Sequence, residues 1–208
     1  MSLLTNWGYT LTELDALPDM LTSSDYYSYT AGRYDGDGRI NSEIAAASQR
    51  IRDYVGWHLY PSTECELVMA LNDRRISITG CDLLIQLPAK YVTEIKKVKI
   101  DETEITAFTY ETNGILRLYD VSLAGLKRYT SVKVKYTAGL PDTLMNGVQE
   151  LAAYNVTHAL ASSNGITSEA AGGVSVTYNV HWVNSARATS LPEDSKEVLA
   201  PFKLQGVF

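Results

Sequence analysis

The sequence predicts an α+β protein in which an antiparallel pair of long helices carries an inserted antiparallel β-rich subdomain, with extended N- and C-terminal arms. Apolar residues recur at spacings of three and four in residues 40–62 and again in residues 141–160, which is the period of a helix with one buried face. Between these stretches apolar residues alternate with polar ones, as in strands that bury one face. The expected organisation is an arm with a short helix in residues 1–40, a helical core of residues 41–63 with 137–165, a β subdomain in 64–136, and a strand with a tail in 166–208.

The composition is that of a globular protein with an acidic balance. Of the 208 residues 45% are hydrophobic and 20% are charged, and the net charge is −6. A protein that grips DNA phosphates over its whole surface is normally basic, so the charge argues against that class. Cys65 and Cys81 lack disulfide-framework or zinc-ligand spacing, which predicts reduced thiols. The first ten residues lack the basic run and apolar core of a signal peptide or membrane anchor, so we expect synthesis in a cytoplasm and no membrane contact.

The N-terminal residues are expected to form an arm followed by a short helix. Residues 1–16 have little periodicity, and we expect the arm to become ordered only when something docks on it. Thr22 and Asp25 form a variant capping box, which predicts that a short helix starts there and runs through about Tyr29.

The Gly/Asp loop that follows is a candidate calcium site that we interpret as a solvated turn. Asp35 and Asp37 match two ligand positions of an EF-hand-like loop. The first and twelfth positions are then Arg33 and Ile44, so two carboxylates are missing, including the bidentate one. We therefore expect no metal.

The first long helix should begin after Asn41 or Ser42, which are good N-cap residues, and end at Gly56 and Pro61. Its buried face is predicted to contain the residues at helical spacing, and Arg50, Arg52 and Asp53 are expected to lie off this face. The residues expected on the buried face are Ile44, Ala47, Ser48, Ile51, Tyr54, Val55 and His58.

The β subdomain is expected to have one solvated and one buried face. In its last strand Lys133 and Lys135 share one face, and Lys97 and Lys99 repeat this arrangement. Such lysines fit either a nucleic-acid contact or the solvated side of an antiparallel sheet. Acidic residues interleaved with these lysines favour the solvated side. Turns are predicted at residues 72–73, 80, 101–102 and 113–114.

The second long helix should open after residues 139–142 and pack antiparallel on the first. Its predicted stripe contains Leu144, Val148, Leu151 and Asn155. After a polar linker in residues 162–173, residues 174–182 alternate as a strand that needs a partner edge in this chain or in a neighbouring one. The last ten residues are apolar with a single charge, so they either fold back onto the protein or insert into another one.

The sequence contains no recognisable catalytic constellation. The histidines His58, His158 and His181 stand apart from any nucleophile elbow, phosphate loop or metal set, and His58 is expected to be structural. We therefore expect a protein that is not an enzyme and that needs no cofactor.

Several short motifs occur in the order found in a known family, and this order rather than any single motif is informative. Residues 51–54, Ile-Arg-Asp-Tyr, followed by Gly56-Trp57-His58 and Pro61, resemble the central helix of tailed-bacteriophage head–tail connector (adaptor) proteins. Residues 17–22 and 30–34 are similar to the lead-in of prophage members, and residues 134–141 to the junction between strand and second helix. Val55 stands where many members have Cys, and both are small buried side chains.

The resemblance implies a structural virion protein of the phage neck, made in the host cytoplasm, that forms a ring of about twelve copies under the portal protein. The ring would extend the DNA channel and provide the platform for the stopper and tail-completion proteins, and genomic DNA would pass without sequence-specific binding. Residues expected to bind the portal are Leu199, Pro201, Phe202, Leu204, Val207 and Phe208. Residues expected at subunit contacts are Trp7, Tyr9, Val174, Val176, Tyr178, Val180 and Trp182, and those expected to line the channel are Glu43, Asp53 and Glu150.

Two other classes remain open at this point. One is a different neck protein, a stopper or tail-completion factor; these are usually β-barrels, which the two long helices disfavour. The other is a partner- or carbohydrate-binding β module with helical flanks, which predicts a monomer with an aromatic-lined groove in residues 64–136.

Overall fold

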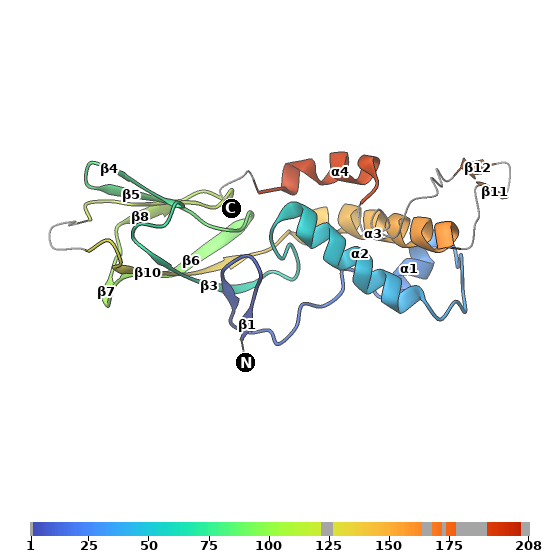
Figure 1. The fold of residues 1–208 in the computed structure, drawn as a ribbon, viewed down its shortest axis with the longest axis horizontal. Coiled ribbons are helices and arrows are strands. Elements are labelled where there is room, and N and C mark those ends of the chain that lie inside the picture. The colour runs from blue at the N-terminus through green and yellow to red at the C-terminus, as the bar shows by residue number, and fades with distance from the viewer. Residues whose placement is uncertain (1, 122–126, 164–167, 172–173, 178–190, 205–208) are drawn as a thin grey trace. The chain divides into compact units, whose positions relative to one another are not determined.

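A computed structural model describes residues 2–121, 127–163, 168–171, 174–177 and 191–204, and divides the chain into two compact units (Figure 1). The β unit comprises residues 1–18, 56–142 and 202–208, and the helical unit comprises residues 19–55 and 143–201. The mixed α and β content with antiparallel sheets agrees with the predicted class. The β unit is larger than the expected insert, because it also includes the N-terminal residues.

A six-stranded antiparallel sheet forms the centre of the β unit. Its strands, in spatial order, are β1 (Leu3–Leu4), β2 (Thr10–Leu11), β3 (Thr63–Ala70), β10 (Ser131–Ala138), β6 (Val92–Ile100) and β7 (Thr103–Glu104). Strand β10 lies between β3 and β6, and Val134 is opposite Leu67 on one side and Val98 on the other. Val134 and Tyr136 are fully buried, whereas Lys133 and Lys135 reach solvent. The predicted two-faced strand is therefore confirmed.

The N-terminal residues are part of this sheet, which corrects the expectation of an arm without regular structure. Strand β2 pairs with β3, and Leu11 lies opposite Cys65. Tyr9 is 1% exposed and Leu11 is completely buried, because side chains two residues apart on an extended chain point to the same face. Two-residue strands are too short to produce a visible sequence period.

A four-stranded sheet completes the β unit. Its strands, in spatial order, are β4 (Ile76–Thr79), β5 (Asp82–Gln86), β9 (Ile115–Leu118) and β8 (Phe108–Tyr110). Strands β7 and β8 were not predicted, whereas the predicted turns lie between strands. At one of them Gly114 has φ +92°, and a Cβ there would lie 2.3 Å from the carbonyl oxygen of Ala89, so only glycine fits.

The helical unit contains four α-helices and a short hairpin among its described residues. They are α1 (Ser23–Thr30), α2 (Ile40–Val55), α3 (Asp142–Ser163), β11 (Ser168–Ala171), β12 (Val174–Thr177) and α4 (Glu193–Leu199), and a 3-10 turn, η1 (Ala200–Phe202), follows α4. The capping box of Thr22 and Asp25 is confirmed, with both of its backbone hydrogen bonds present. Helix α2 begins at Ile40, earlier than expected, and the Ser42 hydroxyl donates to the Arg39 carbonyl.

The two long helices run in opposite directions, as predicted (Figure 1). The predicted core residues Ile44 and Ile51 of α2 are buried, but Arg52 is also buried, at 2% exposed, which corrects its expected place off the apolar face. In α3 the buried face includes Met145, whereas Leu144 is 37% exposed. Small side chains of α3, several of them alanines, lie on more than one side of the helix. The sequence therefore does not mark a single apolar stripe.

Hydrogen bonds connect the helices of this unit. The hydroxyl groups of Tyr26 in α1 and Thr157 in α3 are 3.2 Å apart. The Tyr54 hydroxyl of α2 donates to the Lys196 carbonyl of α4 at 3.1 Å. These bonds fix α1 and α4 to the two long helices.

His58 is a structural residue in the core of the β unit, as expected. Its Nε2 is 3.0 Å from the Ala138 carbonyl oxygen, which only accepts, so Nε2 carries the proton. Its Nδ1 then accepts from the Tyr9 hydroxyl at 2.8 Å, and the same hydroxyl accepts from the His58 backbone N–H at 3.1 Å. The Tyr9–His58 pair therefore joins the N-terminal hairpin to the end of β10.

Replacing Tyr9 with Phe should destabilise the protein by about 1–2 kcal/mol, because both hydrogen bonds at His58 lose a buried partner. Urea unfolding at neutral pH measures this change. Tyr136→Phe is the matched control, since that equally buried hydroxyl has no hydrogen-bond partner among the described residues and its removal should cost less than about 0.5 kcal/mol. Equal losses in the two variants would contradict the assignment.

Candidate interaction surfaces

The C-terminal segment folds back onto the β unit through residues 202–204. The Trp57 Nε1–H donates to the Phe202 carbonyl at 2.9 Å, and the rings of Tyr91 and Phe202 are 6.2 Å apart. Leu204 is 7% exposed and lies against Gly56. The composition left two possibilities for the last ten residues, folding back onto the protein or insertion into another one. Residues 202–204 fold back.

The six expected portal-binding residues differ in accessibility. Leu199 is fully buried in the helical unit and Leu204 is buried in the β unit. Phe202 is half-buried and Pro201 is exposed. Val207 and Phe208 lie outside the described residues. The buried leucines anchor the segment, and Pro201 is the exposed one of the four expected residues that the structure describes.

The expected subunit-contact residues also divide into buried and accessible ones. Tyr9 is buried inside its own unit, whereas Trp7 is half-exposed and stacks on Tyr9 with ring centroids 6.2 Å apart. Val174 and Val176 lie in β12, and their strand finds a partner edge in this chain, since Val176 is opposite Glu169 of β11. The linker predicted in residues 162–173 thus contains a strand. Tyr178, Val180 and Trp182 lie outside the described residues.

The three acidic residues expected at the channel are at least partly accessible. Glu43 forms an ion pair with Arg50 at 3.5 Å, and Asp53 accepts a hydrogen bond from the Gln49 amide at 2.7 Å. Glu150 of α3 is exposed. All three belong to the helical unit.

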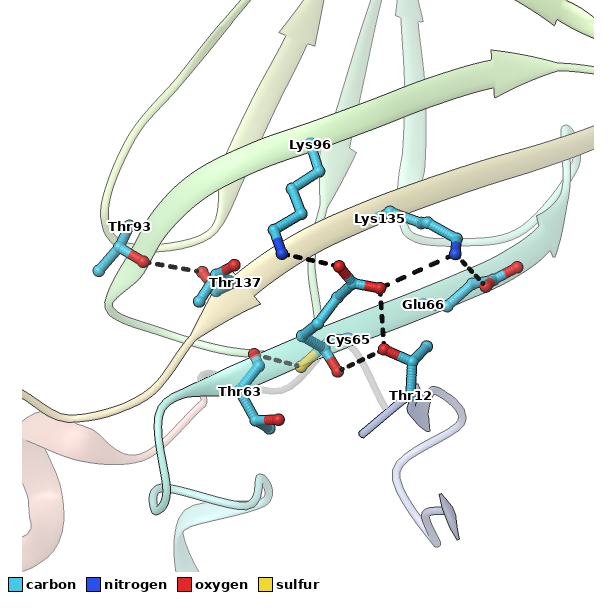
Figure 2. A network of polar contacts seen from close by, with 9 residues as sticks. Thr12, Thr63, Cys65, Glu66, Thr93, Lys96, Lys135 and Thr137 are labelled. Carbon is cyan, nitrogen blue, oxygen red and sulfur yellow. Dashed lines mark hydrogen bonds and ion pairs between the residues drawn. The ribbon is translucent and has the colours of Figure 1, made fainter. Parts of the chain in front are cut away.

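A polar network covers the solvated face of the six-stranded sheet (Figure 2). The Glu64 carboxylate accepts from Lys96 at 2.8 Å and from the Thr12 hydroxyl at 2.8 Å. Lys135 lies 3.8 Å from Glu64 and 3.4 Å from Glu66. The hydrogen bond from Lys96 and then that from Thr12 lower the pKa of Glu64. Because the lysines are paired with carboxylates, the interpretation of this face as a solvated sheet surface is supported.

The two cysteines have different environments. Cys65 is buried beneath the same sheet, and burial raises the pKa of its thiol to about 12. Such a thiol is protonated at neutral pH and unreactive. Cys81 lies in an exposed turn.

The described residues contain no group of three His, Cys, Asp or Glu side chains that could bind a metal ion. In the Gly/Asp loop the Asp37 carboxylate is bound by both the side chain and the backbone N–H of Arg39, which lowers its pKa to about 2. His158 lies on α3, where burial lowers its pKa, and His181 lies outside the described residues.

One surface was missed by the sequence reasoning. Arg74 and Arg75 follow β3, and Lys127 and Arg128 precede β10; we call these four residues the basic rim. The Asn72 N–H donates to the Arg128 carbonyl at 3.2 Å, so the two pairs lie at the same end of the sheet. The signal was one basic pair beside the turn predicted at residues 72–73 and a second pair shortly before the last predicted strand, and the two come together only once β3 and β10 are paired.

The described part of the chain thus consists of two internally packed units with accessible charged and apolar surfaces. The family model described as Head completion protein matches residues 19–203. The chain belongs to the Head completion protein family, a family of phage head–tail connector proteins, and the resemblance noted in the sequence is confirmed. It is therefore a structural protein of the phage head and neck.

No curated protein matches the chain. Within the described ranges no helix is long and apolar enough to cross a membrane.

Glu64→Gln tests the network of the sheet surface. The folded-state pKa of Glu64 lies below its usual value of 4.5, so its stabilisation is complete above about pH 4.5 and is lost as the pH falls through the folded-state pKa. The variant should lose at most about 1 kcal/mol at pH 7, because the pair is partly solvated, and the loss should be smaller at pH 3, below the usual pKa of the carboxyl group.

Urea unfolding at both pH values measures this difference. Glu111→Gln is the control, since Glu111 is exposed and forms no ion pair among the described residues. A loss for Glu64→Gln that is independent of pH would contradict the electrostatic origin.

Proposed function

We propose that this protein is the head-to-tail connector (adaptor) of its phage. It forms a ring of about twelve copies under the portal, extends the DNA channel, and provides the platform for the stopper and tail-completion proteins. The observation that carries the proposal is the family match, which spans residues of both units, from 19 to 203. The protein then resides in the virion neck after synthesis in the host cytoplasm.

The C-terminal segment is the proposed portal contact. Leu199 and Leu204 hold it on the two units, and Pro201 and Phe202 lie between these anchors. Beyond Leu204 the sequence ends in Val207 and Phe208, two apolar residues in a stretch without charge. A short apolar segment that follows a fixed anchor is well suited to insert into a groove of another protein, because only a few residues have to be ordered on binding.

Contacts between copies are proposed at Trp7 and along the segment of residues 174–182. Trp7 supplies a half-exposed aromatic ring next to a turn. The segment of residues 174–182 includes β12, whose pairing partner in the chain is β11. Aromatic rings and strand edges are common elements of subunit interfaces.

The acidic residues Glu43, Asp53 and Glu150 are proposed to face the DNA channel. The helical unit contains eleven acidic and six basic residues, a net charge of −5. A negative wall repels phosphates, so DNA passes without binding.

Removal of residues 205–208 should leave a folded protein that no longer binds portal-containing heads, because both anchors remain and the apolar end is lost. Co-sedimentation with tail-less heads measures binding, and thermal unfolding checks the fold. Glu111→Gln in the β unit, outside this segment, is the control and should bind like the wild type. Infectious tailed particles from the truncated protein would contradict the portal assignment.

Exchanging Glu43, Asp53 and Glu150 together for glutamine should slow DNA ejection from assembled particles, because the wall no longer repels phosphates. The rate of ejection, followed by a DNA-binding dye at low and high salt, measures this effect, which should diminish at high salt. Glu111→Gln in the β unit is the control. An unchanged rate in the triple variant at low salt would remove the support for an acidic channel wall.

A further inference from the structure

The basic rim differs from the rest of the β unit in that three of its four charges, all except that of Arg75, have no acidic partner among the described residues. On the solvated face of the six-stranded sheet the lysines form ion pairs with glutamates; these lysines are Lys96, Lys97, Lys99, Lys133 and Lys135. Arg117 of the other sheet pairs with Asp82. In the rim, by contrast, Arg74, Lys127 and Arg128 have no acidic partner among the described residues, and all three are exposed. Unpaired positive charge is therefore concentrated at one end of β3 and β10.

A hollow of about 350 Å³ adjoins the rim and gives it shape. It is lined by Asn6, Trp7, Gly8, Asp73, Arg74 and Arg75. Asp73 holds the Arg75 guanidinium through two hydrogen bonds, of 2.9 and 2.8 Å, and the Arg75 side chain is only 13% exposed. Arg75 is thus a fixed wall of the hollow, whereas Arg74 at its edge is available to a partner.

Aromatic side chains accompany the rim. Trp7 lines the hollow, and Tyr129, next to Arg128, is 81% exposed, the highest exposure among the large hydrophobic side chains of the described residues. Arginine, tryptophan and tyrosine are the residues that contribute most to protein–protein binding. The combination favours a protein partner with acidic side chains over a DNA phosphate backbone, which the net charge of −6 would repel as a whole.

The chain itself contains a complementary surface. On helix α4, Asp194 and Glu197 are exposed and have no ion-pair partner among the described residues, whereas the neighbouring Lys196 is already bound to Glu193 at 2.8 Å. Val198 beside them is 54% exposed and supplies apolar contact area. An acidic and apolar helix face matches a rim of arginines, lysine and aromatic rings.

We propose that the basic rim binds the Asp194–Glu197 face of α4 in a second copy of this chain. The two surfaces are different, so the contact is head-to-tail, and repetition of such a contact closes into a ring when the rotation allows it. The inference rests on the proposed ring-forming function and names the surfaces that build the ring.

The test uses two charge-reversed variants of the full chain, Arg74→Glu/Arg128→Glu and Asp194→Lys/Glu197→Lys, in sedimentation experiments at low salt without portal. Each variant alone should require at least a roughly tenfold higher concentration for self-association than the wild type, because like charges then meet. A mixture of the two should regain association beyond dimers, because the native contact forms from the α4 variant's rim to the rim variant's α4, and the charge-reversed contact forms in the other direction. The chain with all four substitutions should regain self-association.

The matched control for the rim variant is Lys97→Glu/Arg117→Glu. It changes the net charge by the same amount as the rim variant, at accessible positions of the β unit outside the rim, and should associate like the wild type. Thermal unfolding checks that each variant folds. Unchanged association of either reversed variant, or failure of the fourfold variant to recover, would overturn the proposal. If the rim variant still self-associates but no longer binds duplex DNA, the partner of the rim is DNA instead.

Binding of the wild-type protein to portal is measured separately. It distinguishes a failure of the rim assignment from a failure of the connector function. If the wild type binds portal while the rim variant still self-associates, the rim assignment fails and the connector function stands. If the charge reversals behave as expected but the wild type ignores portal, the copy-to-copy contact stands and the connector function fails.

Discussion

The β unit depends on the close approach of two chain segments at the points where the chain enters and leaves it. A Cβ on Gly139 would lie 2.3 Å from the Ser62 Cα, so any larger residue would displace the start of β3. The Leu140 N–H donates to the Leu59 carbonyl at 2.8 Å, and the His58 ring bonds the Ala138 carbonyl beside it. This junction sets Thr63 opposite Ala138 and thereby the register of the long β3–β10 ladder.

The register determines the chemistry of both faces of the sheet and of its far end. It directs Cys65 and Tyr136 into the core and aligns Glu64, Glu66 and Lys135 on the solvated side, where they form the network in Figure 2. At the other end of the ladder Ser131 lies opposite Ala70, which brings the two halves of the basic rim together. A one-residue slip would exchange the faces and separate these groups.

Sequence patterns predicted those parts of the fold that have a local signal. The alternation around Val134 and the capping box at Thr22 specify their own structures, because the forces that fix them act within a few residues. The burial of Tyr9 and the pairing of β2 depend on β3, more than fifty residues away, and leave no local period. For the same reason the rim was not predicted, since Arg74 and Arg128 become neighbours only through strand pairing. The apolar chain end was recognised from composition, but only the structure shows that Leu199 and Leu204 serve as anchors.

The two units of this protein are each packed internally, and their remaining apolar and charged groups are proposed to contact other molecules. The most direct measurement is the mass in solution of the complex that the wild-type protein forms with purified portal. The account predicts a fixed, whole number of copies bound to each portal ring, with no intermediate occupancy at saturation. A portal whose mass is unchanged in the presence of excess protein would contradict it.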